Sequence, residues 1–152
     1  MIGNDSLTKT AVSATLHCLT GCAIGEVAGM VIGTAFGMSN AVTFAISIAL
    51  AFAFGYTLTS LPLFRSGMTL RQVVPLALAA DTLSIATMEI VDNTVVAVIP
   101  GALDASLTSL LFWGSLAVSL VIAFVAAVPV NRWLIGRGKG HAVVHSHHQH
   151  HE

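Results

Sequence analysis

Two segments of the chain carry thiol, thioether and carboxyl side chains at spacings that place them together on a helix. In the first segment, Cys18, Cys22 and Glu26 recur every four residues, and His17 lies beside Cys18. Residues four apart share one side of an α-helix. Two thiols and a carboxyl group would therefore line a single narrow face, a set able to bind a cation or exchange protons.

The second segment carries three acids and a methionine. Asp81, Ser84, Met88 and Asp92 fall within an arc of about 80° on a helical wheel, and Glu89 lies on the adjacent arc. Hydrogen bonding between helices accounts for nearby Ser, Thr and Asn side chains, but a carboxylate inside a bilayer needs a proton or a cation. We therefore expect a metal site built from eight residues: His17, Cys18, Cys22, Glu26, Asp81, Met88, Glu89 and Asp92.

The elements that position these residues are expected to be membrane helices. The chain has 152 residues, of which 55% are hydrophobic and only 9% charged, whereas soluble domains carry about 25% charged residues. Four apolar segments stand out, at about 7–37, 41–61, 70–99 and 105–134, each long enough to span a bilayer. Their short connections imply antiparallel neighbours. The sequence predicts an all-α integral membrane four-helix up-down-up-down bundle over residues 1–140, followed by a His-rich cytoplasmic tail over 141–152.

The basic residues predict how the bundle is oriented. With four spans, all six lie at one end of the bundle: Lys9, Arg65, Arg71, Arg132, Arg137 and Lys139. The positive-inside rule assigns that end to the cytoplasm, so we expect a multi-pass protein of the inner (cytoplasmic) membrane with both termini cytoplasmic. No basic residue remains to neutralise the acids within the spans, which must bind a cation or be protonated.

Depth along the helices predicts that the first and third segments meet. Cys18 lies nine residues in from Lys9, and Asp81 lies ten residues in from Arg71. Equal numbers of residues from the same end correspond to similar depths, since each helical residue rises 1.5 Å. We expect two tiers, the first of Cys18, Cys22 and Asp81 and the second of Glu26, Met88, Glu89 and Asp92.

Beside the row of Cys18, Cys22 and Glu26, the first segment carries a stripe that consists only of glycine. Its members recur every four residues: Gly21, Gly25, Gly29, Gly33 and Gly37. Small residues at this spacing allow two membrane helices to approach closely. The stripe therefore predicts tight helix packing.

Ligand type favours a soft metal. Thiolate, thioether and imidazole groups suit copper(I) and zinc, so we expect a transition metal ion, with copper favoured over zinc or iron. Six of the seven histidines lie in the tail, which is interpreted as a metal-collecting segment, with a purification remnant or a solubilising end as alternatives. Its candidate ligands are His141, His145, His147 and His148.

Three motifs carry a resemblance to a known family. They are His17-Cys18-x-x-Gly21-Cys22-x-x-Gly25-Glu26, then Asp81-x-x-Ser84-x-x-x-Met88-Glu89-x-x-Asp92-Asn93, and Pro129-x-Asn131 with Gly140-His141. With them the chain resembles an uncharacterised bacterial and archaeal membrane domain family, a domain of unknown function sometimes fused to copper-binding modules. The resemblance covers nearly the whole chain and implies a connection with copper, but it implies no established activity.

The expected function is intramembrane binding and transport of a soft metal cation through sites on the first and third helices. We expect no enzymatic activity and no nucleic-acid partner; the expected partners are the lipid bilayer, a second copy in a homodimer and a soluble copper-binding protein. A structural or assembly role and a proton-handling bundle remain alternatives. A membrane thiol oxidoreductase is disfavoured, because Cβ atoms four residues apart on a helix lie about 5–6 Å apart and a disulfide needs about 3.8 Å.

Overall fold

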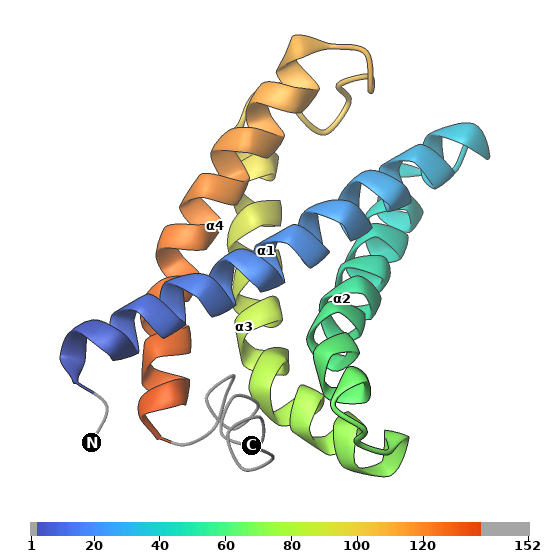
Figure 1. The fold of residues 1–152 in the computed structure, drawn as a ribbon. Coiled ribbons are helices and arrows are strands. Elements are labelled where there is room, and N and C mark those ends of the chain that lie inside the picture. Colours follow the sequence, from blue (N-terminus) through green and yellow to red (C-terminus); the bar gives the residue numbers. More distant parts are fainter. Residues whose placement is uncertain (1–2, 138–152) are drawn as a thin grey trace.

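A computed structural model describes residues 3–137 of the chain (Figure 1). These residues form four helices: α1 (Asn4–Ala35), α2 (Asn40–Arg65), α3 (Leu70–Val98) and α4 (Leu110–Gly136). No strand occurs within 3–137, so the predicted all-α bundle is confirmed. The predicted boundary at residue 140 and the His-rich tail, with His141, His145, His147 and His148, lie outside the described residues.

The short connections reverse the chain three times. The start of α1, the α2–α3 connection and the end of α4 lie at one end of the bundle (Figure 1). We call this the basic end, because the described Lys and Arg side chains belong to it: Lys9, Arg65, Arg71, Arg132 and Arg137. The α1–α2 and α3–α4 connections lie at the opposite end, called the far end. Arg132 on α4 contacts Asn4 and so links the last turns of α4 to the start of α1.

The helices have the length and composition of membrane spans. Three of them, α1, α2 and α4, are long and apolar enough to cross a bilayer. Helix α3 is bent by 46° between Leu70–Ala79 and Asp81–Val98 and supplies a fourth span when its two segments are counted together. Large apolar side chains point outward, among them Ile90 and Val125, which are 69% and 66% exposed. This surface suits lipid, and the chain has the architecture of a multi-pass membrane protein.

Two helix ends depend on glycine in the left-handed region. Gly37 follows α1 with φ +62°, and the amide of Met38 donates to the Gly33 carbonyl at 2.9 Å. Gly67 follows α2 with φ +90°, and Met68 donates to Leu63 in the same way. Both are glycine-based helix caps. Gly37 therefore forms a turn, and the prediction that it belongs to the packing stripe is wrong.

Helix α4 begins five residues later than the predicted residue 105. The Ser109 side chain accepts a hydrogen bond from the Phe112 amide at 3.1 Å, which caps the helix at Leu110. Just before it, Ser106 and Thr108 bond to each other at 3.0 Å. Hydroxyl side chains that form local hydrogen bonds compete with helix formation. The predicted start at residue 105 rested on apolar composition alone and did not take these hydrogen bonds into account.

The remaining glycines of the stripe pack α1 directly onto α2. A Cβ atom on Gly25 would overlap the backbone of Ala51, and one on Gly21 would lie 2.9 Å from the Cα atom of Gly55. Helix α2 presents its own small residues at the same spacing: Thr43, Ser47, Ala51 and Gly55. The predicted tight packing is confirmed, and it is internal to the chain. These glycines are buried against α2 and are not left free as a face for a second copy.

Helix α4 closes the bundle with another row of small buried residues: Ser115, Ser119, Ala123 and Ala127. The row ends at Asn131, whose Nδ2 donates to Thr15 Oγ1 on α1 at 2.8 Å. Both side chains are buried, at 2% and 0% exposure. This hydrogen bond holds α1 against α4 near the basic end.

We expect Asn131→Ala to lower the free energy of unfolding by about 1 kcal/mol, the usual range for an interhelical hydrogen bond in a membrane protein. The measurement is reversible unfolding in mixed micelles, followed by circular dichroism. Thr94→Ala is the matched control, since the exposed Thr94 hydroxyl bonds only to its own helix at Ile90. Equal stability of the two variants would show that the Asn131 bond adds nothing to the fold.

Candidate functional site

The sulfur and acid residues of α1 and α3 meet in three successive levels between the helices. At the first level the Cys18 thiol donates to Asp81 Oδ1 at 3.6 Å. Both residues are 0% exposed, as is Ser84. Asp81 opens the second segment of α3, directly after its bend, and so faces α1 from the start of that segment.

The second level contains the other two sulfurs. Cys22 lies beside the Glu89 carboxyl group, not beside Asp81 as the two-tier prediction had it. Met88 joins Cys18 and Cys22 in one buried cluster, which also contains Ile85, Ala51, Ala123 and Ala127. The three sulfur residues are at most 1% exposed. Thiol and thioether groups from two helices thus share one enclosed region, called here the sulfur cluster (Cys18, Cys22 and Met88).

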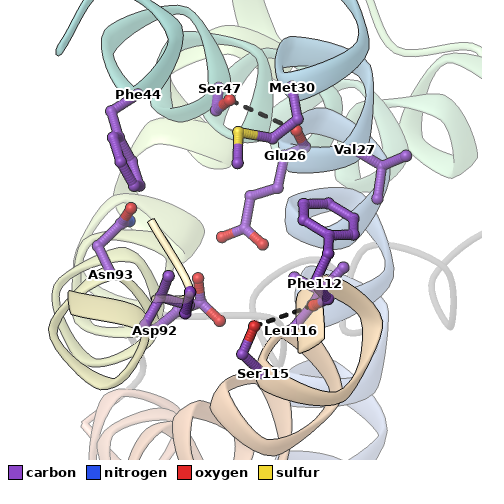
Figure 2. Close-up of a pocket in the computed structure, with 12 residues that line it drawn as sticks. Glu26, Val27, Met30, Phe44, Ser47, Asp92, Asn93, Phe112, Ser115 and Leu116 are labelled. Carbon is purple, nitrogen blue, oxygen red and sulfur yellow. Dashed lines mark hydrogen bonds between the residues drawn. The ribbon is translucent and has the colours of Figure 1, made fainter. Parts of the chain in front are cut away.

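The third level is an acid pair, Glu26 on α1 and Asp92 on α3. Figure 2 shows the two carboxyl groups directed into the same cavity, which has a volume of about 30 Å³. One water molecule needs roughly 10–15 Å³ measured in this way, so the space is small but has room for water. Glu26 is 6% exposed and Asp92 4% exposed.

His17 does not join the buried residues. Its ring is exposed, and Nε2 lies 2.9 Å from the carbonyl oxygen of Leu58 on α2. A ring nitrogen that donates to a carbonyl cannot bind a metal through the same atom. His17 is therefore exposed, whereas the seven other predicted site residues are all buried, although it lies near enough to Asp81 to interact with it electrostatically.

The buried groups are arranged as pairs. Within residues 3–137, no three His, Cys, Asp or Glu side chains converge in a way that could hold a metal ion. The pairs are Cys18 with Asp81, Cys22 with Glu89, and Glu26 with Asp92. A further sulfur ligand is available in the same buried cluster as the thiols, the Met88 thioether.

The sequence analysis missed the contribution of α2 and α4. Small hydroxyl residues of both helices border the acids: Ser47 on α2, and Ser115 and Ser119 on α4. The sequence signal for these residues was the spacing of four residues between hydroxyl side chains, which places them on one face of a helix. Ser115 and Ser119 have this spacing on α4, and Thr43 and Ser47 have it on α2. These helices are therefore walls of the site as well as scaffold.

None of the curated proteins and none of the solved structures compared matches the chain. The model of one family matches residues 8–140, which include all of α2, α3 and α4, α1 from Thr8 onward, and every buried residue of the three levels. The predicted membership of an uncharacterised family is therefore confirmed, and the chain belongs to the family described as "Domain of unknown function (DUF4396)".

Proposed function

We propose that this protein binds a soft transition-metal cation inside the membrane and transports it along the interface of α1 and α3. The observation that supports this most is the sulfur cluster, in which two thiols and a thioether are buried together from two helices. Sulfur ligands select soft ions, copper(I) above all, with zinc and iron(II) as weaker candidates.

The acids beside the sulfurs fit the chemistry of metal binding. A thiol must lose its proton before it binds a metal, and the carboxyl groups of Asp81 and Glu89 lie next to Cys18 and Cys22. They provide acceptors for the released protons. None of the six Lys and Arg residues belongs to the three levels. An ionised acid in this region therefore has no basic side chain as its counter-charge, which favours binding of a cation.

The levels extend along the direction a transported ion would follow. Cys18 and Glu26 are eight residues apart on α1, about 12 Å along the helix axis. Transport requires several sites that each bind weakly enough to release the ion to the next. We further propose that the protein lies in the inner membrane of the cell with its basic end facing the cytoplasm. We also propose that the protein works as a homodimer and that a soluble copper-binding protein exchanges metal with it.

The test is metal content by elemental mass spectrometry on detergent-purified protein truncated after Lys139, which removes the tail histidines. We expect about one copper ion per chain after loading with copper(I), and none in Cys18→Ser/Cys22→Ser, because the thiolates supply most of the affinity. Met88→Leu is expected to weaken binding, while Met38→Leu, in the α1–α2 connection, serves as the matched control. The proposal fails if no copper, zinc or iron is retained after loading with each.

A further inference from the structure

The cavity beside Glu26 and Asp92 is lined by a sulfur side chain that belongs to neither of the other two levels. Met30 lies one helical turn beyond Glu26 on α1 and borders the same cavity (Figure 2). Residues four apart share one side of a helix, so α1 contributes a thioether and a carboxyl group to the cavity, and α3 contributes a second carboxyl group. With Met30 included, the third level has three side chains able to bind a metal ion.

The carboxyl oxygens of this level lack protein donors. Neither oxygen of Glu26 nor Oδ1 of Asp92 has a hydrogen-bond partner among the described residues, although Glu26 is only 6% exposed. A buried polar atom without a partner is costly, and such atoms in native proteins commonly mark the position of an ion or a water molecule. The cavity of about 30 Å³ into which both carboxyl groups point has room for one.

The other polar side chains that line the cavity direct their hydrogens elsewhere. Ser47 donates to a backbone carbonyl of α1 at 3.4 Å, and Ser115 donates to backbone carbonyls of its own helix. The Asn93 amide donates to the backbone carbonyl and the carboxyl group of Glu89. A hydroxyl group has only one hydrogen, while its oxygen keeps its lone pairs. The cavity is therefore lined by electron-pair donors, to which Met30 adds a sulfur, and it suits a cation.

Access and charge favour exchange of this cation with the far end. Ala102 of the α3–α4 connection forms part of the cavity wall, and Phe44 and Phe112, near the starts of α2 and α4, flank the cavity (Figure 2). At the same end, the exposed Asp104 accepts a hydrogen bond from Asn40. The described basic side chains all belong to the opposite end, so none of them repels a cation that enters or leaves here.

Glu89 connects this cavity with the sulfur cluster. Its carboxyl group lies beside Cys22 and close to Asp92, and Cys22 precedes Glu26 by one helical turn, about 6 Å along the axis. An ion held by the thiols thus has a row of ligands leading toward the far end. Carboxylates hold a soft ion less firmly than thiolates do, and an ion can be released only from a site that binds it weakly enough.

We propose that Met30, Glu26 and Asp92 form a second, weaker metal site, through which the soft cation passes between the sulfur cluster and the far end. This inference rests on the proposed function and adds to it a ligand, Met30, and the end of the bundle at which the ion is exchanged. The step is an exchange of ligands alone. Bonds from the ion to the sulfur cluster are replaced by bonds to Met30 and the two carboxylates, and the ion keeps its oxidation state.

The test is nuclear magnetic resonance of the full-length protein in detergent micelles, with isotope-labelled methionine methyl groups, titrated with copper(I) under nitrogen. Met30→Leu and Met88→Leu assign the two signals of interest among the five methionines. We expect copper(I) to shift the Met88 signal first and the Met30 signal only at higher copper(I) concentration, because the carboxylate-rich site binds more weakly. The signal of Met38, in the α1–α2 connection, should not move.

This measurement is specific to each site. A methyl label reports on its own methionine, so copper(I) held by the tail histidines does not contribute to the shifts. The titration is also made at equilibrium, and it detects a weakly bound ion that would be lost when excess metal is removed after loading.

Replacing the two acids should affect one signal and not the other. In Glu26→Gln/Asp92→Asn, the copper(I) concentration that shifts Met30 should rise more than about tenfold, the loss common when even a supporting group of a metal site is removed. The Met88 response should stay as in the wild type. Asp104→Asn is the matched control, since it removes an acid at the far end that does not line the cavity, and both signals should respond normally. A far-ultraviolet circular dichroism spectrum equal to that of the wild type establishes that the double variant is folded.

The outcomes separate this inference from the proposed function. A Met30 signal that stays in place while Met88 shifts, or a Met30 response that the acid double variant leaves unchanged, would overturn the second site and leave metal binding by the sulfur cluster standing. In Cys18→Ser/Cys22→Ser, the Met30 signal should still shift while the Met88 response is lost; loss of both responses would show a single site at the thiols and overturn the inference. If neither signal shifts in the wild type, both proposals fail.

Discussion

Gly25→Ala is expected to lower the free energy of unfolding by about 2–3 kcal/mol, the upper part of the range for overpacking. The added methyl group would meet the backbone of Ala51, and backbone atoms at a helix contact cannot move aside without separating α1 from α2. The same two helices carry the walls of the site, so separation would also displace Cys22 and Glu26. Unfolding in mixed micelles, followed by circular dichroism, measures the change.

Alanine substitutions at two further glycines should give smaller losses of stability than Gly25→Ala. Gly114→Ala, on α4, places its methyl group in open space, and we expect a change within about 0.5 kcal/mol, as for most exposed substitutions. Gly55→Ala would meet the Cδ1 atom of Ile85 at 2.7 Å, and a flexible side chain can rotate away, so an intermediate loss is expected. The close packing of α1 on α2 would be contradicted if Gly25→Ala were as stable as Gly114→Ala.

The second large effect is expected on transport. In vesicles loaded with a copper(I) chelator, metal flux should respond to an imposed pH gradient, because thiol deprotonation and the acid pair couple metal and proton occupancy. Glu26→Gln/Asp92→Asn should reduce the gradient-dependent flux at least about tenfold, a loss common when a group supporting a metal site is removed. Fluorescence of a copper-sensitive dye inside the vesicles follows the flux.

Copper content separates transport from binding in this experiment. The double variant should still bind copper, since the sulfur cluster is unchanged, whereas Cys18→Ser/Cys22→Ser should lose both binding and flux. Asp104→Asn should transport like the wild type. Wild-type flux that ignores the pH gradient, or a double variant that transports normally, would contradict the coupling.

The sequence by itself determined the architecture of the chain. Apolar length and low charge predicted an all-α bundle, and the basic residues predicted which helix ends lie together, as the structure confirms. Spacing of four residues predicted that glycines on α1 pack a neighbouring helix. These features follow from composition and helical periodicity, which are local properties of a sequence.

Only the tertiary structure decided which groups meet. Cys22 lies beside Glu89 instead of Asp81, because α3 bends by 46° before Asp81 and its register against α1 cannot be obtained from residue counting. His17 precedes Cys18 directly but projects toward Leu58 on α2, since adjacent residues point about 100° apart on a helix.

The cavity beside Glu26 and Asp92 likewise depends on four helices at once. Its serine hydroxyls come from α2 and α4, where the spacing of four residues was the only signal in the sequence, and their hydrogens are bonded to backbone carbonyls. Whether a buried acid finds a donor depends on such long-range packing, which helical periodicity does not encode. The sequence therefore determined which groups belong to the apolar helices, and the packing of the helices decided which of them form pairs.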